Sequence, residues 1–168
     1  SGNNAGRELV LEQNYAYARR AQQAGDYETA RRMFTELGDY KDARNLELAC
    51  RSLEARQLMD DGELLAALEL FESLGVYPGT DAGLDTVKEK LYQRALDCAC
   101  AGDYEQACGI WQRLEDYGDS RVLEWRCERV LGWSRDESAA PMFSEDLSSV
   151  DVDYFRGLGT DAEVKVAV

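Results

Sequence analysis

The sequence contains no histidine, and its basic residues are outnumbered by acidic ones. It has 19 lysines and arginines against 33 aspartates and glutamates, which gives a net charge of −14 at pH 7. The acidic residues are spread from Glu8 to Glu163 rather than gathered in one tail. Phosphate backbones and anionic membrane surfaces repel such a chain on average. We therefore expect no nucleic-acid partner.

Long apolar runs and a signal peptide are also missing. No run is long enough to cross a bilayer, and the start lacks the basic and hydrophobic regions of a signal peptide, so we expect no direct membrane insertion. Residues 1–8 are interpreted as a linker or a scar left by cloning, before which an anchor or signal could lie. The cysteines are odd in number and fall in stretches of helical pattern, which suits buried thiols in a reducing, cytoplasmic compartment: Cys50, Cys98, Cys100, Cys108 and Cys127.

The residues that carry catalysis or bind metals do not form a recognisable set. The sequence offers no nucleophile with its base and no phosphate-binding loop, so we expect neither an enzyme nor a cofactor. Cys98 and Cys100 are two positions apart, and on a helix such residues point about 200° away from each other. They cannot face one ion, and no histidine is present to help. We expect no metal site.

What the sequence does contain is a segment that occurs three times. In the first copy Gly25 is followed by an aromatic residue at Tyr27, by Ala30 and by a second aromatic residue at Phe34. The same spacing returns in two further sets: Gly62, Leu64, Ala67, Phe71, and Gly102, Tyr104, Ala107, Trp111. The glycines are 37 and then 40 residues apart, so insertions occur between copies and not within them. This pattern predicts a stack of helical hairpins.

Apolar periodicity and turn residues give the helix bounds. The expected helices cover residues 9–24, 26–37, 42–61, 63–74, 81–101, 103–114 and 119–133. A second repeating segment joins the hairpins: Tyr40 to Cys50 has a counterpart from Tyr117 to Cys127, and a looser copy around Tyr77 is interpreted as lengthened by Pro78 and Gly79. In these junctions Asp42, Asp81 and Asp119 are expected to cap the following helix, each contributing about 1 kcal/mol.

The pattern changes after Trp133. Residues 134–141 have no periodicity and contain turn formers, so a boundary is placed there. Beyond it, apolar and polar residues alternate over 150–155 and again over 164–168, with a glycine-containing loop at 157–161. This favours a β-hairpin or the start of a further domain. The expected organisation is thus 1–8, a helical repeat domain over 9–133, and a C-terminal segment over 134–168.

The helical part resembles the tetratricopeptide repeat family. The resemblance covers roughly Leu9 to Trp133 and includes a small residue seven positions before each repeat glycine: Ala18, Ala55 and Ala95. It departs from the family in its longer units, the missing terminal proline and the Tyr-x-Asp-Ala/Ser junction. That variant is similar to degenerate repeats of Gram-positive bacteria, some of which carry a zinc ribbon or a membrane anchor elsewhere. The resemblance implies an all-α, right-handed solenoid of three hairpins with a capping helix.

In this family the first helix of each hairpin lines a concave face, where a partner peptide commonly lies. Transferred position by position, the implied binding residues are Tyr15, Arg19, Gln22 and Gln23, then Ser52, Arg56 and Met59, then Glu89, Tyr92 and Leu96, with Glu12, Asp60 and Cys100 beside them. Tyr15 and Tyr92 could stack on an acidic or aromatic extended peptide whose carboxylates Arg19 and Arg56 bind. The family's carboxylate clamp of lysine and asparagine is absent.

These observations favour a protein-interaction scaffold that binds a partner protein or peptide on its concave face. An alternative is a structural or regulatory module of a larger protein, which contacts partners or self-associates through the C-terminal strands. A third possibility is self-association through the last helix around Trp125 and Trp133.

Overall fold

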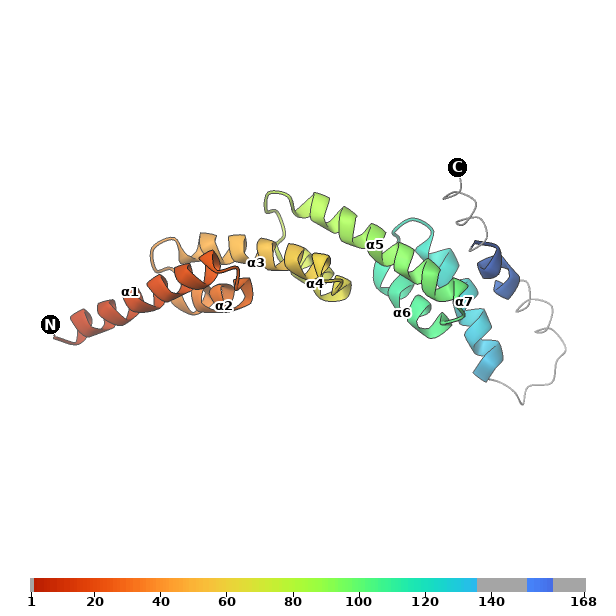
Figure 1. Ribbon diagram of the computed structural model, residues 1–168, viewed down its shortest axis with the longest axis horizontal. Coiled ribbons are helices and arrows are strands. Elements are labelled where there is room, and N and C mark those ends of the chain that lie inside the picture. The colour runs from red at the N-terminus through yellow and green to blue at the C-terminus, as the bar shows by residue number, and fades with distance from the viewer. Residues whose placement is uncertain (1, 136–150, 159–168) are drawn as a thin grey trace. The chain divides into compact units, whose positions relative to one another are not determined.

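A computed structural model describes residues 2–135 and 151–158, and every element in this part of the chain is helical (Figure 1). Seven helices follow one another: α1 (Gly2–Gln23), α2 (Tyr27–Leu37), α3 (Ala43–Asp60), α4 (Leu64–Ser73), α5 (Thr80–Cys100), α6 (Tyr104–Leu114) and α7 (Ser120–Arg135). A further short helix covers residues 151–158. The predicted all-α class is confirmed.

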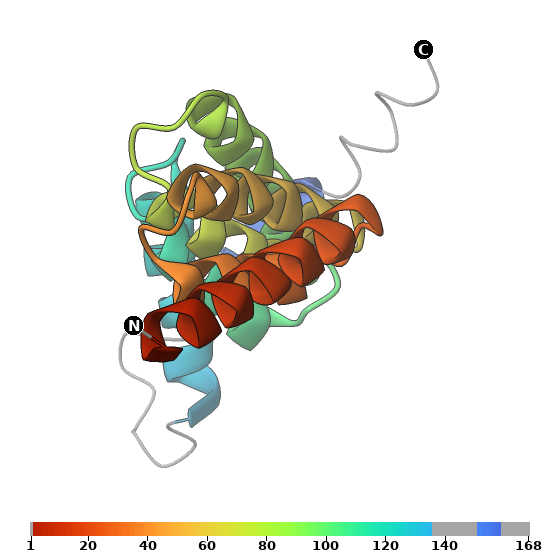
Figure 2. The same ribbon diagram turned by 90° about the vertical axis from the view of Figure 1, so that its left-hand side faces the viewer.

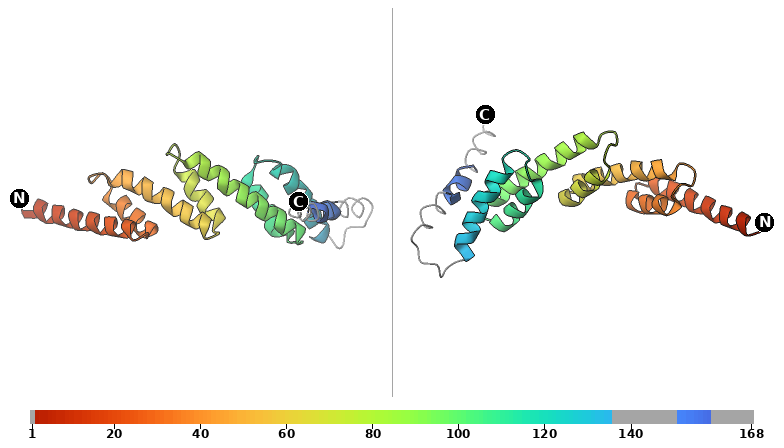
Figure 3. Two further views of the ribbon diagram at one scale, coloured as in Figure 1. Left: turned by 45° about the horizontal axis from the view of Figure 1, so that its top comes forward. Right: turned by 180° about the vertical axis from the view of Figure 1, so that it is seen from behind.

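The chain divides into two compact units, Ser1–Val87 and Lys88–Val168, and the division falls inside α5. In the first unit α1 packs against α2, α2 against α3, and α3 against α4 (Figures 1 and 2). In the second unit α6 packs against α7, and the helix at 151–158 lies alongside α7 in both views of Figure 3. The predicted repeat domain, 9–133, extends over both units.

The repeat glycines end the first helix of each hairpin. Gly25, Gly62 and Gly102 have φ values of 80°, 85° and 85°, a region that disfavours residues with a Cβ atom. Each turn closes with the same pair of backbone hydrogen bonds, for example from Gly25 N to Gln22 O and from Asp26 N to Ala21 O. Asp26 then caps α2 by accepting from Thr29 N at 3.1 Å. This is the turn that the repeat pattern predicts.

The alanine and the second aromatic residue of each copy are core residues. Ala30 and Phe34, Ala67 and Phe71, and Ala107 and Trp111 all have 0% of their surface exposed. Small alanines allow the helices to approach closely, and the large rings fill the space beyond them. The signature is therefore explained by packing within each unit.

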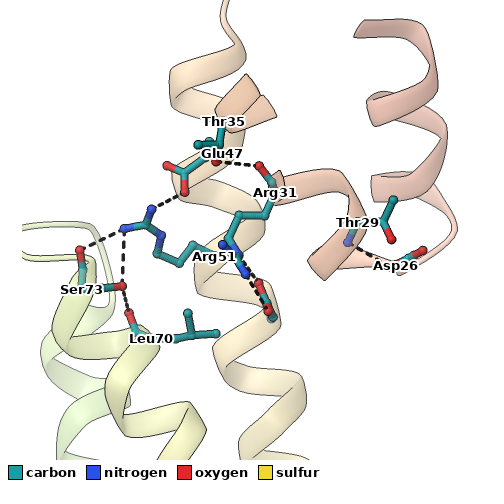
Figure 4. A network of polar contacts seen from close by, with 9 residues as sticks. Asp26, Thr29, Arg31, Thr35, Glu47, Arg51, Leu70 and Ser73 are labelled. Atoms are coloured by element: carbon teal, nitrogen blue, oxygen red, sulfur yellow. Dashed lines mark hydrogen bonds and ion pairs between the residues drawn. The ribbon is translucent and has the colours of Figure 1, made fainter. Parts of the chain in front are cut away.

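Charged side chains tie neighbouring helices of the first unit together (Figure 4). Arg31 of α2 pairs with Glu54 of α3, and Arg51 of α3 pairs with Glu47 and donates to Ser73 O at the end of α4. The side chains of Glu47 and Glu54 are only 11% and 12% exposed. The Arg31–Glu54 pair joins α2 to α3, whereas the Arg51–Glu47 pair lies within α3; pairs of such low exposure add little net stability.

The junction between hairpins corrects one prediction. Backbone hydrogen bonds of 3.1 Å join Ala43 N to Tyr40 O, Thr80 N to Tyr77 O and Ser120 N to Tyr117 O, so the segment from the tyrosine to the start of the next helix has the same length in all three junctions. The interpretation that Pro78 and Gly79 lengthen it is wrong. The additional residues lie in α5, which has 21 residues where α3 has 18. Asp81 accordingly lies inside the first turn of α5 and does not cap it.

Gly83 lies where the longer α5 passes over α4. Its counterparts, each three residues after the start of a helix, are Leu46 and Leu123. A Cβ atom at Gly83 would be 2.4 Å from Phe71 Cε1, and Phe71 is fully buried. Only glycine leaves room for this ring, because a contact that short is repulsive.

Two predictions about the ends of the chain are also corrected. A linker is predicted over residues 1–8, but α1 begins at Gly2. Residues 151–158 form a helix, so the strand expected over 150–155 is not formed there. Asp151 and Phe155 are both buried while Asp153 between them is exposed, as on a helix; a strand would place all three on one face. The second expected strand, 164–168, lies outside the described residues.

Candidate functional site

The ten predicted binding residues lie on the first helix of each hairpin. Tyr15, Arg19, Gln22 and Gln23 are on α1, Ser52, Arg56 and Met59 are on α3, and Glu89, Tyr92 and Leu96 are on α5. The first seven belong to the first unit and the last three to the second. Ser52 is buried, with 6% of its surface exposed, and Gln23, Arg56 and Glu89 are exposed. Only part of the set is therefore accessible to a partner.

Tyr15 belongs to a quartet of hydrogen-bonded residues within its own unit, which consists of Glu12, Tyr15, Tyr40 and Asp42. The Tyr15 hydroxyl donates to Asp42 Oδ1 at 2.5 Å, and the Tyr40 hydroxyl donates to Glu12 Oε2 at 2.7 Å. The two rings meet edge to face, with centroids 6.0 Å apart and an interplanar angle of 70°. Asp42 makes no capping bond to α3, so the predicted role of this side chain as an N-cap is wrong.

A second quartet repeats the first in the other unit, each member 77 residues later: Glu89, Tyr92, Tyr117 and Asp119. The Tyr92 hydroxyl donates to Asp119 Oδ1, and the Tyr117 hydroxyl donates to Glu89 Oε2 at 3.0 Å. The rings are 6.2 Å apart at 64°. Ion pairs beside the quartets repeat as well, from Arg44 to Asp39 and from Arg121 to Asp116.

The carboxylates set the protonation of the tyrosines. The hydrogen bond to Glu12 raises the pKa of Tyr40 well above its usual range, and burial together with the bond to Asp119 does the same for the pKa of Tyr92. In return, hydrogen bonds from Lys41 and Tyr40 lower the pKa of Glu12. At neutral pH the tyrosine hydroxyls are therefore protonated, and each donates its hydrogen bond to a carboxylate of its quartet.

Tyr92→Phe is expected to lower the free energy of unfolding by about 1 kcal/mol, because it removes one hydrogen bond to a carboxylate and leaves the ring in place. Urea denaturation followed by circular dichroism measures this loss. Tyr17→Phe is the control, since Tyr17 is 57% exposed, and it should change stability by less than about 0.5 kcal/mol. If Tyr92→Phe in an Asp119→Ala background costs as much as it does in the wild type, the two side chains are not coupled and the quartet has no energetic role.

The middle hairpin lacks the quartet. Counted back from the repeat glycine, Ala49 and Ser52 stand where the other copies have Glu12 or Glu89 and Tyr15 or Tyr92. Of the remaining predicted residues, Arg19 Nη1 donates to Gln22 Oε1 at 3.0 Å, and Arg56 is exposed beside Gly79. On the predicted face of the first unit Gln23 and Arg56 are thus exposed, and Arg19 is partly exposed.

Comparison with family models, curated proteins and solved structures gives no match to this chain. Within the described ranges, no helix combines the length and apolar character that spanning a bilayer requires. The same ranges contain no group of three or more acidic or cysteine side chains placed to hold a metal ion. The site must be interpreted from its own geometry.

Sequence reasoning missed a contact site in the second unit, which we call the Arg–Trp surface and which consists of Cys100, Tyr104, Trp111, Arg126 and Arg129. It holds the helix at 151–158. Arg126 Nη1 donates to Asp151 Oδ1 at 3.0 Å, and Arg129 Nε lies 3.1 Å from Asp151 Oδ2, within ion-pair distance though outside hydrogen-bond geometry. The Asp151 side chain is 2% exposed. Two arginines compensate for the burial of its charge.

Phe155 is the second anchor of the short helix on the Arg–Trp surface. It has 0% of its surface exposed and stacks on Trp111, with ring centroids 5.7 Å apart and planes 18° apart. Tyr104 contacts the same ring at 5.8 Å, and Cys100 Sγ donates to the Phe155 carbonyl at 3.1 Å. The spacing of Asp151 and Phe155 gave no decisive signal, because residues four apart share one face of a strand as well as of a helix.

Four of the five cysteine thiols have a raised pKa. Burial raises the pKa of the Cys50 thiol to about 11 and that of Cys127 to about 12. Burial also raises the pKa of Cys98 and Cys100. These thiols stay protonated at neutral pH, and the thiol form is a poor nucleophile and metal ligand.

A shallow groove of about 520 Å³ lies between α6 and α7. Its lining includes Glu105 and Glu128, Cys108, Leu131, and two glycines that leave the space open, Gly109 and Gly132. The charges at this groove are both negative. It is therefore less suited to an acidic peptide than the Arg–Trp surface is.

Proposed function

We propose that this chain is a non-enzymatic interaction module, built from tetratricopeptide-like hairpins, that binds a segment of a partner protein rich in acidic and aromatic residues. Each unit has a binding surface of its own. The first unit uses Arg19, Gln23 and Arg56 on the first helices of its hairpins, and the second unit uses the Arg–Trp surface.

One observation carries the proposal: the second unit already holds a peptide segment of this kind. The segment at 151–158 presents an acid and an aromatic residue, and it reaches the predicted face through Cys100 of α5. Tyr154 also lies close enough to Tyr92 to contribute to its raised pKa. A surface that accommodates one such helix through charge and ring stacking has the chemistry to bind another.

The first unit supports the proposal through its exposed donors. Arg56 is exposed on α3, and a guanidinium group can bind a carboxylate through two parallel hydrogen bonds. Tyr15 is removed from the predicted contacts because it donates to Asp42. Binding on this unit should therefore depend on charge more than on stacking.

An array of acidic and aromatic peptides, probed with the purified chain, tests the proposal. Arg56→Glu is expected to weaken binding to the bound subset at least tenfold, because it places a like charge opposite the ligand carboxylates. Arg32→Glu is the matched control: it makes the same change of charge at an exposed position of α2, outside the face, and should leave binding within twofold. If both variants bind the array as the wild-type chain does, the proposed use of this face is wrong.

A further inference from the structure

Asp151 and Phe155 hold the helix at 151–158 in place. Their contacts are more specific than covering the hydrophobic core would require. In the first unit the counterpart of Trp111 is Phe34, which is equally buried and packs against Tyr15 with centroids 6.0 Å apart. The described ion pairs of low exposure in that unit, Arg31–Glu54 and Arg51–Glu47, join residues of the repeats to one another, whereas Asp151 joins a segment from outside the repeats. A buried ion pair adds little net stability and strongly favours one partner over others.

The arginines of the Arg–Trp surface are particular to the second unit. Counted from the start of their helix, Arg126 and Arg129 occupy the places that Ala49 and Ser52 occupy on α3. The residues around them are otherwise similar, since Cys50 matches Cys127 and Glu47 matches Glu124. The positive charge therefore lies where the short helix docks and not at the equivalent place in the first unit.

The short helix itself depends on docking. It has eight residues, and isolated helices of that length are marginal in water. Its buried side chains are Asp151 and Phe155, whereas Asp153 and Arg156 on the other side are 76% and 73% exposed. Arg126 also stacks on the Tyr154 ring at 4.2 Å. Recognition is thus concentrated in an acid and an aromatic residue four positions apart.

We infer that the Arg–Trp surface is a receptor for a short helix with an acidic residue and, four positions later, an aromatic residue, and that residues 151–158 are its built-in ligand. A partner helix with this pair of residues binds by displacing them. The inference rests on the proposed function, because it names the partner class for the second unit, but it involves different residues from those of the first-unit face. The attached segment competes at high effective concentration, so it lowers the apparent affinity for a partner.

Fluorescence anisotropy with a labelled peptide probe, the sequence of residues 151–158 with blocked ends, tests this inference on the full chain. Asp151→Asn combined with Phe155→Ala weakens the built-in ligand, and this variant is expected to bind the probe at least tenfold more tightly than the wild-type chain does. A probe with the same two substitutions should not bind. Adding Arg126→Ala and Arg129→Ala to the variant should abolish binding, and circular dichroism verifies that it remains helical.

Each of these results either supports or overturns the inference. It is overturned if the weakened variant binds the probe no better than the wild type, or if the substituted probe binds equally well. If the double arginine variant loses helicity, Arg129→Ala alone replaces it, with an expected loss of at least tenfold. The peptide-array experiment with Arg56→Glu tests the first unit. If that experiment fails while the probe binds the Arg–Trp surface as expected, only the proposed use of the first-unit face is overturned.

Discussion

Replacing Trp111 by alanine lowers the free energy of unfolding by about 3 to 5 kcal/mol. Trp111 is the largest fully buried side chain of the described residues, and its ring supports Phe155 as well as the contact between α6 and α7. Its indole Nε1 has no hydrogen-bond partner in the structure, so the loss comes from packing and the cavity left behind. In thermal unfolding this corresponds to a fall in Tm on the order of 10 °C for a chain of this size.

Trp125→Ala is the matched control for this substitution. Trp125 is 54% exposed, and its described contact is with the guanidinium of Arg129 at 4.4 Å from the ring centroid. Losing an exposed cation–π contact costs about 0.5 to 1 kcal/mol. Thermal unfolding followed by circular dichroism at 222 nm compares the two variants. If both substitutions lowered the stability equally, Trp111 would not lie in a packed core.

Gly83→Ala and Gly109→Ala should change stability in opposite directions. At Gly83 the added methyl group meets the fully buried Phe71 ring at 2.4 Å, so overpacking costs about 1 to 3 kcal/mol. Gly109 lies inside α6 and is exposed, and no atom lies within 4 Å of the place that an added methyl group would occupy. Alanine there gains up to about 1 kcal/mol from helix propensity.

Urea denaturation of the two glycine variants beside the wild type gives the sign of each change. Both sites are in helices, so intrinsic propensity favours alanine at both, and only the neighbouring ring differs. A stabilised Gly83→Ala variant would show that Phe71 can move aside and that the close approach of α5 to Phe71 is not tightly packed.

The helices could be predicted from the sequence because their signals are local. The glycine turns, the aspartate caps of α2 and α6 and the apolar periodicity place most bounds within one or two residues of those observed. The first turns of α1 were missed because Gly2 and Gly6 are poor helix formers, and residues 4–10 are exposed without an apolar stripe. The helix at 151–158 was missed because alternating Val and Asp suggested a strand, and the spacing of the buried pair fits one face of a strand as well as of a helix.

The binding residues were harder to predict because their partners are distant in sequence. Tyr15 and Tyr92 resemble exposed ligand contacts until Asp42 and Asp119, each 27 residues later, are brought to them by the fold. The same aspartates precede helices, and a local interpretation assigns them to capping. The constant separation of 27 residues in both copies was the one signal that could have linked them. Arg126 and Arg129 gave no such signal, because the carboxylate that they bind lies beyond the repeats.

The two tyrosine quartets also give the chain a second, longer repeat. Three hairpins share the glycine, alanine and aromatic pattern, yet the quartets and their neighbouring ion pairs return only after 77 residues, as from Glu12 to Glu89, and skip the hairpin between. The core residues therefore repeat with every hairpin, whereas the polar contacts at the junctions repeat only with every second one. Equivalent positions of neighbouring hairpins thus have the same packing but different surface chemistry.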